Sequence, residues 1–327
     1  MIVYQFAKRE PTFDDKDNFF ADWPARMTRF VSIGECMVEL APGAAADDLK
    51  LGFAGDTFNT AWYVKALAPD YESRFVSRVG TDAVSDRMLA MMGCAGIDTS
   101  HLLREGARSV GLYLISLQDG ERSFSYWRDN SAARLLAQDR PALEAATTDA
   151  DLIYFSGITM AILDAAGRAT LLDVMRTMRA LGKTIAFDSN LRPRLWASPA
   201  EMCATVMQAA AVSDIVLPSY DDEADHFGDI NIAATRDRYA KAGASTVIVK
   251  DGAGDVHYLR DGVTGSVQTN PVTQIVDTTS AGDSFNAGFF VGRERGTEDA
   301  IRLASKVAGH VIGQKGALVP LPTKGFS

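Results

Sequence analysis

The sequence has few cysteines and no long apolar run, and each shortage excludes a class of protein. Its three cysteines, Cys36, Cys94 and Cys203, lie far apart and form no CxxC pair. Neither a disulfide framework nor a cysteine-based metal site is therefore expected. We expect buried free thiols in a reducing compartment, by default the cytoplasm. No stretch of about 18 apolar residues is present, which argues against a transmembrane helix.

Two common nucleotide-binding motifs are also missing. The sequence has no GxxxxGK[ST], which excludes a P-loop enzyme. The Gly252-Ala253-Gly254 run lacks the third glycine of GxGxxG and precedes a strand-like run, which disfavours a dinucleotide-binding fold. The four histidines are scattered and form no HExxH motif, so we expect them to be structural or on the surface.

Positive charge is scarce. Against 42 Asp and Glu stand 33 Lys and Arg, which gives a formal net charge of −9. This balance argues against nucleic acid or an anionic membrane as the main partner. An anionic substrate would need arginine or lysine placed locally. The 327 residues, 47% of them hydrophobic, suit a globular protein with a large core.

The first residues differ from the rest of the chain. In residues 1–29, polar and aromatic residues alternate, and no apolar segment of the kind found in secretory signal peptides is present. We predict that they form an N-terminal extension. Either Met27 is the natural start, or residues 1–26 form a dispensable extension. A single domain is predicted over residues 30–327.

From residue 30 onward, short apolar runs alternate with segments of helical spacing. This alternation predicts an α/β protein whose mostly parallel sheet is covered on both faces. In such sheets, ligands bind at the carboxyl ends of the strands. Six candidate loops fall there, at residues 34–35, 55–59, 188–196, 217–223, 250–255 and 277–283.

Residues 110–128 interrupt this alternation. Asp119-Gly120 lies between two strand-like runs, which is a strong signal for a hairpin. The hairpin could be a plain edge piece. Its aromatic and basic residues instead favour a lid that covers a ligand. An exposed edge strand of such a lid could pair with a second copy of the chain.

A small-residue turn near the C-terminus is the candidate catalytic element. Residues 280–282 run directly into a segment of helical spacing, and a helix N-terminus offers free N–H groups and a dipole that favour an anion. Asp283 lies on the first turn. It could simply stabilise the helix, or it could deprotonate a hydroxyl that attacks a phosphate.

The run DTTSAGDSFNAG at residues 277–288 resembles the signature D-T-x-x-A-G-D-x-F-x-x-G of the ribokinase-like (PfkB) family of sugar and nucleoside kinases. The resemblance spans residues 30–320. GECMVEL (34–40), GFAGDTFNT (52–60), YWR (126–128) and NLRPRLWAS (190–198) are similar to members that phosphorylate keto-deoxy sugar acids. The resemblance implies a ribokinase-like three-layer α/β/α fold with a mostly parallel central sheet. A small β-strand lid would form around residues 40–54 and 109–129.

The resemblance also implies ATP-dependent transfer to the 6-hydroxyl of a 2-keto-3-deoxy sugar acid. Asp283 would be the general base, and the N–H groups of Ala281, Gly282 and Asp283 would form the anion hole. The sugar-binding motif of the family corresponds to Gly55, Asp56 and Asn59. Asp56 could alternatively act only as a helix cap.

Two arginines, Arg128 and Arg192, distinguish an acid sugar from a neutral one. A keto acid carries a carboxylate that arginine can bind with two hydrogen bonds, whereas a neutral sugar needs no cation. We predict that both arginines contact the substrate and that Tyr113 and Tyr126 add hydroxyl contacts. Alternatively, the arginines form solvated surface ion pairs.

The remaining candidates would bind nucleotide and metal. The family's nucleotide-binding region corresponds to Asn190, Ser219, Lys250, Gly252, Gly254, Ser280 and Gly282. Where the family often has Asn-x-x-Glu, this chain has Ser219 to Asp222, with Glu223 next. Either carboxylate could hold Mg²⁺, which needs few protein ligands. Asp277 and Thr279 resemble family positions that line a monovalent-cation site, which would hold K⁺.

Two other functions remain open at this stage. One is a fructokinase-like or other ketose kinase. The other is a non-catalytic sugar or nucleotide sensor on the same fold, against which the intact Gly282-Asp283 pair argues.

Overall fold

The computed structural model describes residues 28–322, except residues 44, 46–47, 119–120, 270–271 and 273. Of the predicted extension, residues 1–27 lie outside the described part of the chain. The side chains of residues 117–118 and 121–122 are also outside it.

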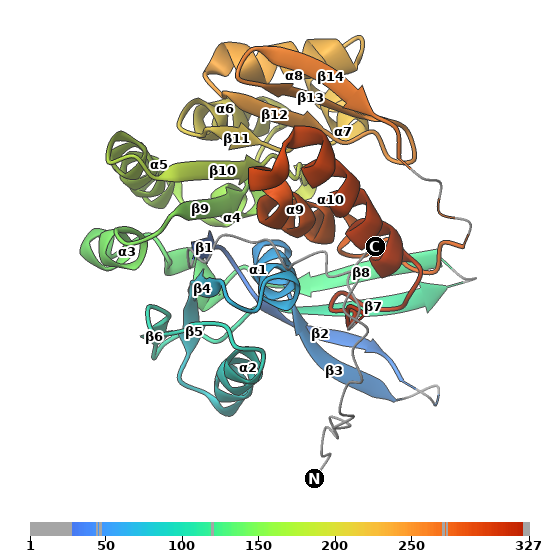
Figure 1. Cartoon of the computed structure of the whole chain (residues 1–327). Coiled ribbons are helices and arrows are strands. Elements are labelled where there is room, and N and C mark those ends of the chain that lie inside the picture. The colour runs from blue at the N-terminus through green and yellow to red at the C-terminus, as the bar shows by residue number, and fades with distance from the viewer. Residues whose placement is uncertain are drawn as a thin grey trace.

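The centre of the molecule is one sheet of eight strands, seen one above another in Figure 1. In spatial order the strands are β14 (Val263–Val267), β13 (Val256–Arg260), β12 (Thr246–Val249), β11 (Ile215–Val216), β10 (Thr184–Asp188), β9 (Leu152–Ser156), β1 (Arg29–Ile33) and β4 (Glu72–Val76). Pairing is parallel from β4 to β12 and antiparallel for β13 and β14. The mostly parallel sheet is therefore confirmed.

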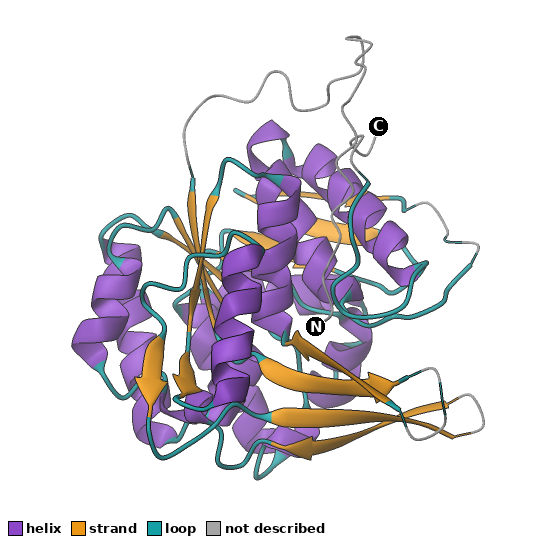
Figure 2. Ribbon diagram, turned by 90° about the horizontal axis from the view of Figure 1, so that it is seen from below, coloured by secondary structure: helices purple, strands orange, loops and turns teal. Residues whose placement is uncertain are grey.

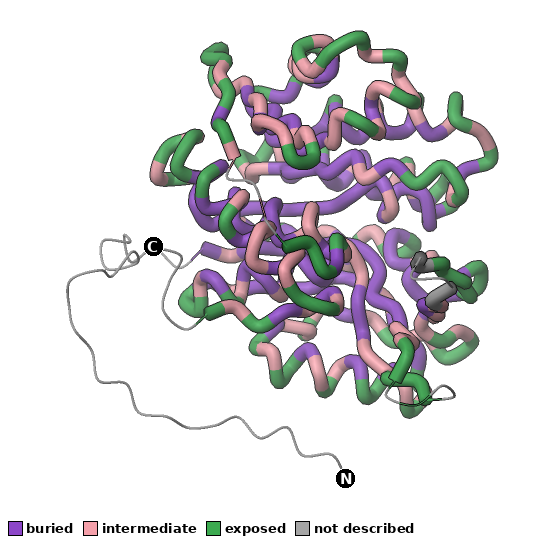
Figure 3. Tube along the Cα trace, turned by 90° about the vertical axis from the view of Figure 1, so that its right-hand side faces the viewer, coloured by how far each residue is buried: buried purple, intermediate pink, exposed green. Residues whose placement is uncertain are grey.

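Helices cover both faces of this sheet. One core cluster contains residues of α1 (Asp56–Leu67), α2 (Ala83–Cys94), α9 (Ala281–Gly292) and α10 (Thr297–Ile312). The other contains residues of α3 (Arg140–Thr147), α4 (Gly157–Ile162), α5 (Ala165–Ala180), α6 (Pro199–Ala211), α7 (Tyr220–Phe227) and α8 (Ile232–Ala242). Strands β9 and β12 are buried throughout, as Figure 3 shows for the central strands. Burial on both faces explains their continuous apolar runs.

Several helices begin where a capping residue precedes them. Asp82 accepts hydrogen bonds from the backbone N–H groups of Val84 and Ser85 at the start of α2. Ser198 does the same for Glu201, and Pro199 opens α6. Each acceptor side chain satisfies N–H groups that the helix itself cannot, and proline suits the first helical position. Three 3-10 turns, η1 (Ala132–Leu135), η2 (Pro193–Leu195) and η3 (Arg293–Arg295), and the short pair β5 (Arg78–Gly80) and β6 (Leu103–Glu105) complete the described elements.

A second sheet projects from the main body (Figure 2). This lid sheet has the order β3 (Leu49–Ala54), β2 (Met37–Pro42), β7 (Leu112–Gln118) and β8 (Glu121–Trp127). Strands β7 and β8 pair antiparallel from Leu112 opposite Trp127 to Gln118 opposite Glu121. The predicted hairpin is confirmed, although its Asp119-Gly120 tip lies outside the described residues.

The ends of all four lid strands meet at Glu35. Its side chain forms an ion pair with Arg128, which follows β8. A Cβ placed on Gly55, which follows β3, would lie 2.0 Å from the backbone oxygen of Glu35. One placed on Gly111, which precedes β7, would lie 2.9 Å from Glu35 Oε1. Only glycine permits such close approach, so the four chain crossings between the lid sheet and the body lie close together around Glu35.

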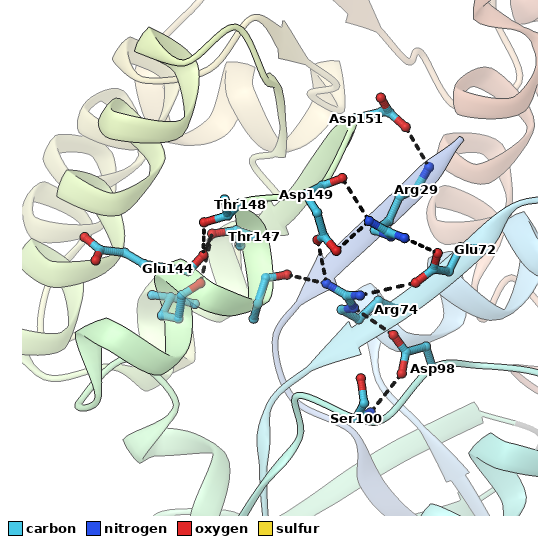
Figure 4. Close-up of polar contacts among 12 residues, drawn as sticks. Arg29, Glu72, Arg74, Asp98, Ser100, Glu144, Thr147, Thr148, Asp149 and Asp151 are labelled. Atoms are coloured by element: carbon cyan, nitrogen blue, oxygen red, sulfur yellow. Dashed lines mark hydrogen bonds and ion pairs between the residues drawn. The ribbon is translucent and has the colours of Figure 1, made fainter. Parts of the chain in front are cut away.

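A network of charged side chains ties the amino-terminal side of the sheet together (Figure 4). Arg74 on β4 is at its centre, with a side chain only 5% exposed. It contacts Asp98 at 2.7 Å, Asp149 at 2.8 Å and Glu72 at 3.2 Å. Arg29 joins the same Asp149 and Glu72 from β1. The network lies opposite the edge where ligands are expected.

The prediction of three buried thiols is wrong for Cys94. All three cysteines are free, but only Cys36 is buried, Cys203 is partly exposed and Cys94 is exposed. Cys94 is the last residue of α2, where a helix end faces solvent although the sequence around it is apolar. In the described part of the chain, no helix has both the length and the apolar character needed to cross a membrane.

Candidate active site

The starts of α1 and α9 meet at the carboxyl edge of the central sheet, and Asn59 joins them. Its Nδ2 donates to Ser280 Oγ at 2.8 Å and to Asp283 Oδ2 at 2.9 Å. Its Oδ1 accepts from the Gly55 N–H at 3.2 Å. One amide therefore links the predicted sugar motif to the predicted base across more than two hundred residues of sequence.

The turn before α9 has an unusual backbone conformation. Ser280 has φ 60° and ψ 17°, the left-handed region, which residues other than glycine rarely adopt outside functional or strained sites. The Ala281 N–H donates to Thr278 O at 3.2 Å, so it is not free for an anion as predicted. Among the described residues, the N–H groups of Gly282 and Asp283 have no hydrogen-bond partner. The turn thus offers two free donors rather than three.

Asp283 lies at the bottom of this site. Burial, together with the charges of Asp56 and Asp188, raises the pKa of its carboxyl to about 7, although hydrogen bonds from Asn59 and Ser280 oppose the shift. A carboxylate with a pKa near neutrality can accept a proton during turnover and release it afterwards.

Asp56 is the second carboxylate of the site. Asn190 Nδ2 donates to Asp56 Oδ2 at 2.7 Å, and Asn190 itself has φ 33°. Burial raises the pKa of Asp56, while hydrogen bonds from Ser156 and Asn190 oppose the rise. Asn190, predicted to bind nucleotide, therefore lies beside the sugar motif.

Lys250 lies between β10 and α9. Its Nζ is 3.1 Å from Asp188 Oδ2 and 3.3 Å from Asn286 Oδ1. A Cβ placed on Gly282 would lie 3.8 Å from this ammonium nitrogen, so Lys250 borders the turn. Asp188 and Asn286 were missed as site residues, although Asp188 ends a predicted strand and Asn286 belongs to the quoted signature.

The other predicted nucleotide residues lie around the ends of β11 and β12. Ser219 precedes α7 and pairs with Lys250 in a single β-bridge. Gly252 has φ 52°, which favours glycine. A Cβ on Gly254 would lie 2.4 Å from Asp251 Oδ2. The two glycines therefore keep this loop tight.

The two predicted Mg²⁺ ligands have different surroundings. Glu223 is fully buried, bound by Arg238 at 2.7 Å and by the Tyr239 hydroxyl at 2.9 Å, so its oxygens are already occupied. Asp222 has a partly exposed side chain, 4.0 Å from Arg192. Its carboxylate is therefore accessible to a metal ion that keeps its own water molecules. The described residues contain no cluster of three or more His, Cys, Asp or Glu suited to a metal ion.

Asp277 is buried beside the α9 turn. Its Oδ1 accepts from the Thr279 N–H at 3.0 Å and its Oδ2 from the Gly316 N–H at 2.8 Å. Both oxygens thus already accept a backbone N–H, although a carboxylate oxygen can accept a further partner. The monovalent-cation role of Asp277 and Thr279 stays a prediction.

The predicted substrate-selecting residues divide between the lid sheet and the body. Tyr113 is buried and donates to Glu39 Oε2, and its ring lies 5.9 Å from that of the exposed Tyr126. Arg128 is buried in its pair with Glu35. Arg192 has a side chain 53% exposed, which leaves its guanidinium available to a ligand.

Sequence comparison agrees with this geometry. A profile of the pfkB family of carbohydrate kinases matches residues 27–324. The chain belongs to this family of carbohydrate kinases. The 2-dehydro-3-deoxygluconokinase of Haemophilus influenzae is 38% identical to this kinase over 304 residues, which cover 90% of this chain and 96% of that protein. The enzyme of the same name from Escherichia coli K12 is 37% identical over 298 residues, covering 88% and 96%.

Solved structures show the same fold. A fructokinase with bound ATP from Xylella fastidiosa matches this kinase with a TM-score of 0.78, covering 90% of this chain and 95% of that one at 24% identity. The predicted ribokinase-like architecture is thereby confirmed.

Proposed function

We propose that this kinase transfers the γ-phosphoryl group of ATP to the 6-hydroxyl of 2-keto-3-deoxygluconate, giving 2-keto-3-deoxy-6-phosphogluconate. The observation that carries the proposal is the position of Asp283 beside the free N–H groups of the α9 turn. Relatives named 2-dehydro-3-deoxygluconokinase, at 37–38% identity over most of both chains, support the choice of sugar.

Asp283 is the general base in this mechanism. Its carboxylate takes the proton of the 6-hydroxyl as that oxygen attacks the γ-phosphorus. The bond from the γ-phosphorus to the bridging oxygen breaks, and ADP leaves with the electron pair. Asn59 holds Asp283 Oδ2 at 2.9 Å, which fixes the carboxylate for the attack. The N–H groups of Gly282 and Asp283 face the charge on the transferred group.

The sugar is held from the body and from the lid sheet. Gly55, Asp56 and Asn59 contact its hydroxyls near the base. Arg192 and Arg128 bind the carboxylate at the other end, with Tyr113 and Tyr126 beside them. Of the two arginines, Arg192 is the more available to the substrate carboxylate, because its guanidinium is exposed, whereas Arg128 is already paired with Glu35.

The nucleotide binds across Ser219, Lys250 and the tight loop at Gly252 and Gly254. Asp222 would hold Mg²⁺ through water, and the ion would neutralise phosphate charge. Asp277 and Thr279 would hold a monovalent cation beside the turn.

The function is tested by assaying ATP consumption with 2-keto-3-deoxygluconate, its C4 epimer and fructose. We expect the acid sugars to give a kcat/KM at least about tenfold above that of fructose, because one charge-assisted contact contributes about 1.5 kcal/mol or more. A higher kcat/KM with fructose would indicate a ketose kinase instead. No ATP consumption with any sugar would indicate a sensor.

The role of Arg192 is tested with Arg192→Leu. We expect the KM for the acid sugar to rise about 10- to 100-fold, the equivalent of about 1.5–3 kcal/mol, while kcat/KM for fructose changes little. Arg194→Leu is the matched control, because Arg194 is an exposed arginine of the same turn. Equal losses on both sugars would reject the carboxylate contact.

A further inference from the structure

The end of β10 carries a buried carboxylate that the proposed mechanism does not use. We propose that Asp188 is a positioning residue that holds the Lys250 ammonium beside the α9 turn, where Lys250 binds the γ-phosphoryl group during transfer. This inference rests on the proposed phosphoryl transfer but not on which sugar accepts the group.

Asp188 is bound by donors from three parts of the chain. Its Oδ2 accepts from Asn286 Nδ2 at 2.6 Å and from Lys250 Nζ at 3.1 Å. Its Oδ1 accepts from the Asn190 N–H at 3.0 Å. The side chain is only 6% exposed, so neither oxygen depends on solvent for a partner. Such a carboxylate fixes its cation in place through a charge-assisted hydrogen bond.

Lys250 retains capacity for a ligand. An ammonium has three N–H donors, and the described residues occupy two, with Asp188 and Asn286 as acceptors. The side chain is 12% exposed. Its nitrogen borders Gly282, whose N–H and that of Asp283 have no partner among the described residues. Two backbone donors and one cationic donor therefore lie around one small volume.

The pair has a poor explanation as a purely structural contact. Burying two opposite charges costs desolvation free energy that a well-packed apolar pair would avoid. Here the cation lies at the mouth of a turn built from small residues, beside the base of the reaction. A fixed cation at that place stabilises negative charge on the transferred group without any rearrangement.

The charges around Asp283 give a readout that a structural role would not produce. Asp56 from α1 and Asp188 from β10 are the negative charges that raise its pKa, and Lys250 from the end of β12 lies 3.1 Å from Asp188 Oδ2. The charge of Asp283 in turn acts on the Tyr63 and Tyr154 hydroxyls. Removing the Lys250 charge leaves the nearby negative charges without a compensating cation, which raises the pKa of Asp283. Removing the Asp188 charge takes away one of these negative charges, which lowers that pKa. The two changes therefore act on the Asp283 proton in opposite directions.

The first experiment uses Lys250→Met, with Lys250→Arg as the charge-retaining control. We expect Lys250→Met to lower kcat about 10²- to 10³-fold, as the loss of one donor to a reacting oxyanion does, and to leave the sugar KM within about threefold. The acid limb of the kcat/KM profile should move to higher pH. Lys250→Arg should keep the limb in place and recover part of kcat. Wild-type kcat in Lys250→Met would overturn the proposal.

The second experiment uses Asp188→Asn, which keeps the shape of the side chain. We expect kcat to fall about 10-fold or more and the acid limb to move to lower pH. If the acid limbs of Lys250→Met and Asp188→Asn moved in the same direction, or if neither moved, the pair would only support the fold.

A binding measurement covers the case in which a variant is unstable or no sugar has been identified. Calorimetric titration of full-length wild type and Lys250→Met with ATP and with ADP, each with Mg²⁺ and without sugar, separates the γ-phosphate from the rest. We expect Lys250→Met to lose about tenfold in ATP affinity and to bind ADP as wild type does. Equal losses for both nucleotides would overturn the γ-phosphoryl contact while leaving the kinase function intact.

Discussion

At the scale of single residues, the amide of Asn59 fixes the orientation of Asp283, the proposed base. It donates to both Ser280 and Asp283 and accepts from Gly55, so its orientation is fixed by three partners. A hydrogen bond to the ionised form opposes the rise in the pKa of Asp283 that burial causes. The base therefore remains usable near neutral pH.

Gly282 offers a separate test of the turn. A Cβ there would meet nothing closer than Lys250 Nζ at 3.8 Å, so Gly282→Ala should change the free energy of unfolding by less than about 0.5 kcal/mol. The methyl group would enter the space assigned to the phosphoryl group, and kcat should fall about 10²-fold, as small misplacements of reacting groups do. Urea unfolding and a kinase assay measure the two effects.

Gly93→Ala is the matched control. Gly93 is also in a helix, and a Cβ there would meet nothing within 4 Å, but α2 lies outside the site. It should keep full activity and gain about 0.5 kcal/mol of stability. Full activity in Gly282→Ala would contradict the position of the phosphoryl group.

Single residues also show where sequence reasoning stops. The base and the sugar motif could be predicted from the signature, but their contact through Asn59 could not, because nothing local links them. Asp222 and Glu223 are neighbours on α7 and so point about 100° apart. Which of them is available to a metal depends on Arg238 and Tyr239 of α8, which only the fold brings near.

At the scale of elements, the Arg74 network joins β1 and β4 to the segments before β9 and after α2. Burial raises the pKa values of Asp98 and Asp149, but hydrogen bonds from Arg74 outweigh it and both values are lowered. The stability that these carboxylates contribute is present above the unfolded pKa of about 4. It is lost as the pH falls through their lower folded values.

Arg74→Met tests this network. It leaves three carboxylates without their central cation, and we expect a loss of about 3 kcal/mol in the free energy of unfolding at pH 7. Activity at low temperature should be unchanged, because the network lies opposite the site. Arg104→Met, which breaks the exposed pair with Asp86, should cost about 0.5 kcal/mol or less. Similar losses in the two variants, measured by urea unfolding, would contradict a special role for burial.

Helices and strands could be assigned from the sequence where the apolar pattern was long or was bounded by capping or turn residues. α6 and the β7–β8 hairpin have clear capping and turn signals. α4 was missed, since its six residues follow directly on β9 and contain too few turns to show a period. The antiparallel direction of β13 and β14 was likewise not predicted, because apolar content does not specify the direction of pairing.

At the scale of the whole molecule, Asp283 couples activity and stability to pH with opposite signs. Its pKa rises from 3.8 to about 7 on folding. Between these values the folded protein holds a proton that the unfolded chain has lost, so this group's contribution to stability falls as the pH rises. The proposed mechanism needs the ionised carboxylate of Asp283, so activity is expected to rise over the same window.

We therefore expect kcat/KM to increase about tenfold per pH unit up to about pH 7 and then to level off. Asp283→Asn should abolish nearly all turnover. It should unfold at a higher temperature than wild type at pH 8 and at nearly the same temperature at pH 4, as measured by calorimetry. A kcat/KM plateau that extends below pH 5 would contradict the raised pKa.

The overall architecture was the most predictable level. Alternating apolar runs predict a parallel sheet, and ligands at its carboxyl edge follow from that topology. The orientation of the lid sheet and the meeting of its strand ends at Glu35 were not predictable, because they depend on contacts of Glu35 with residues 20 to 93 positions away.

The base of the lid sheet belongs to the same core as the body. Val38 of β2 and Phe53 of β3 are members of the cluster that contains α1, α9 and α10, and Leu112 of β7 packs against it. Tyr126 on β8 is exposed instead. A movement of the base would have to repack buried side chains, so any adjustment of the lid to a ligand is expected at its exposed outer strand.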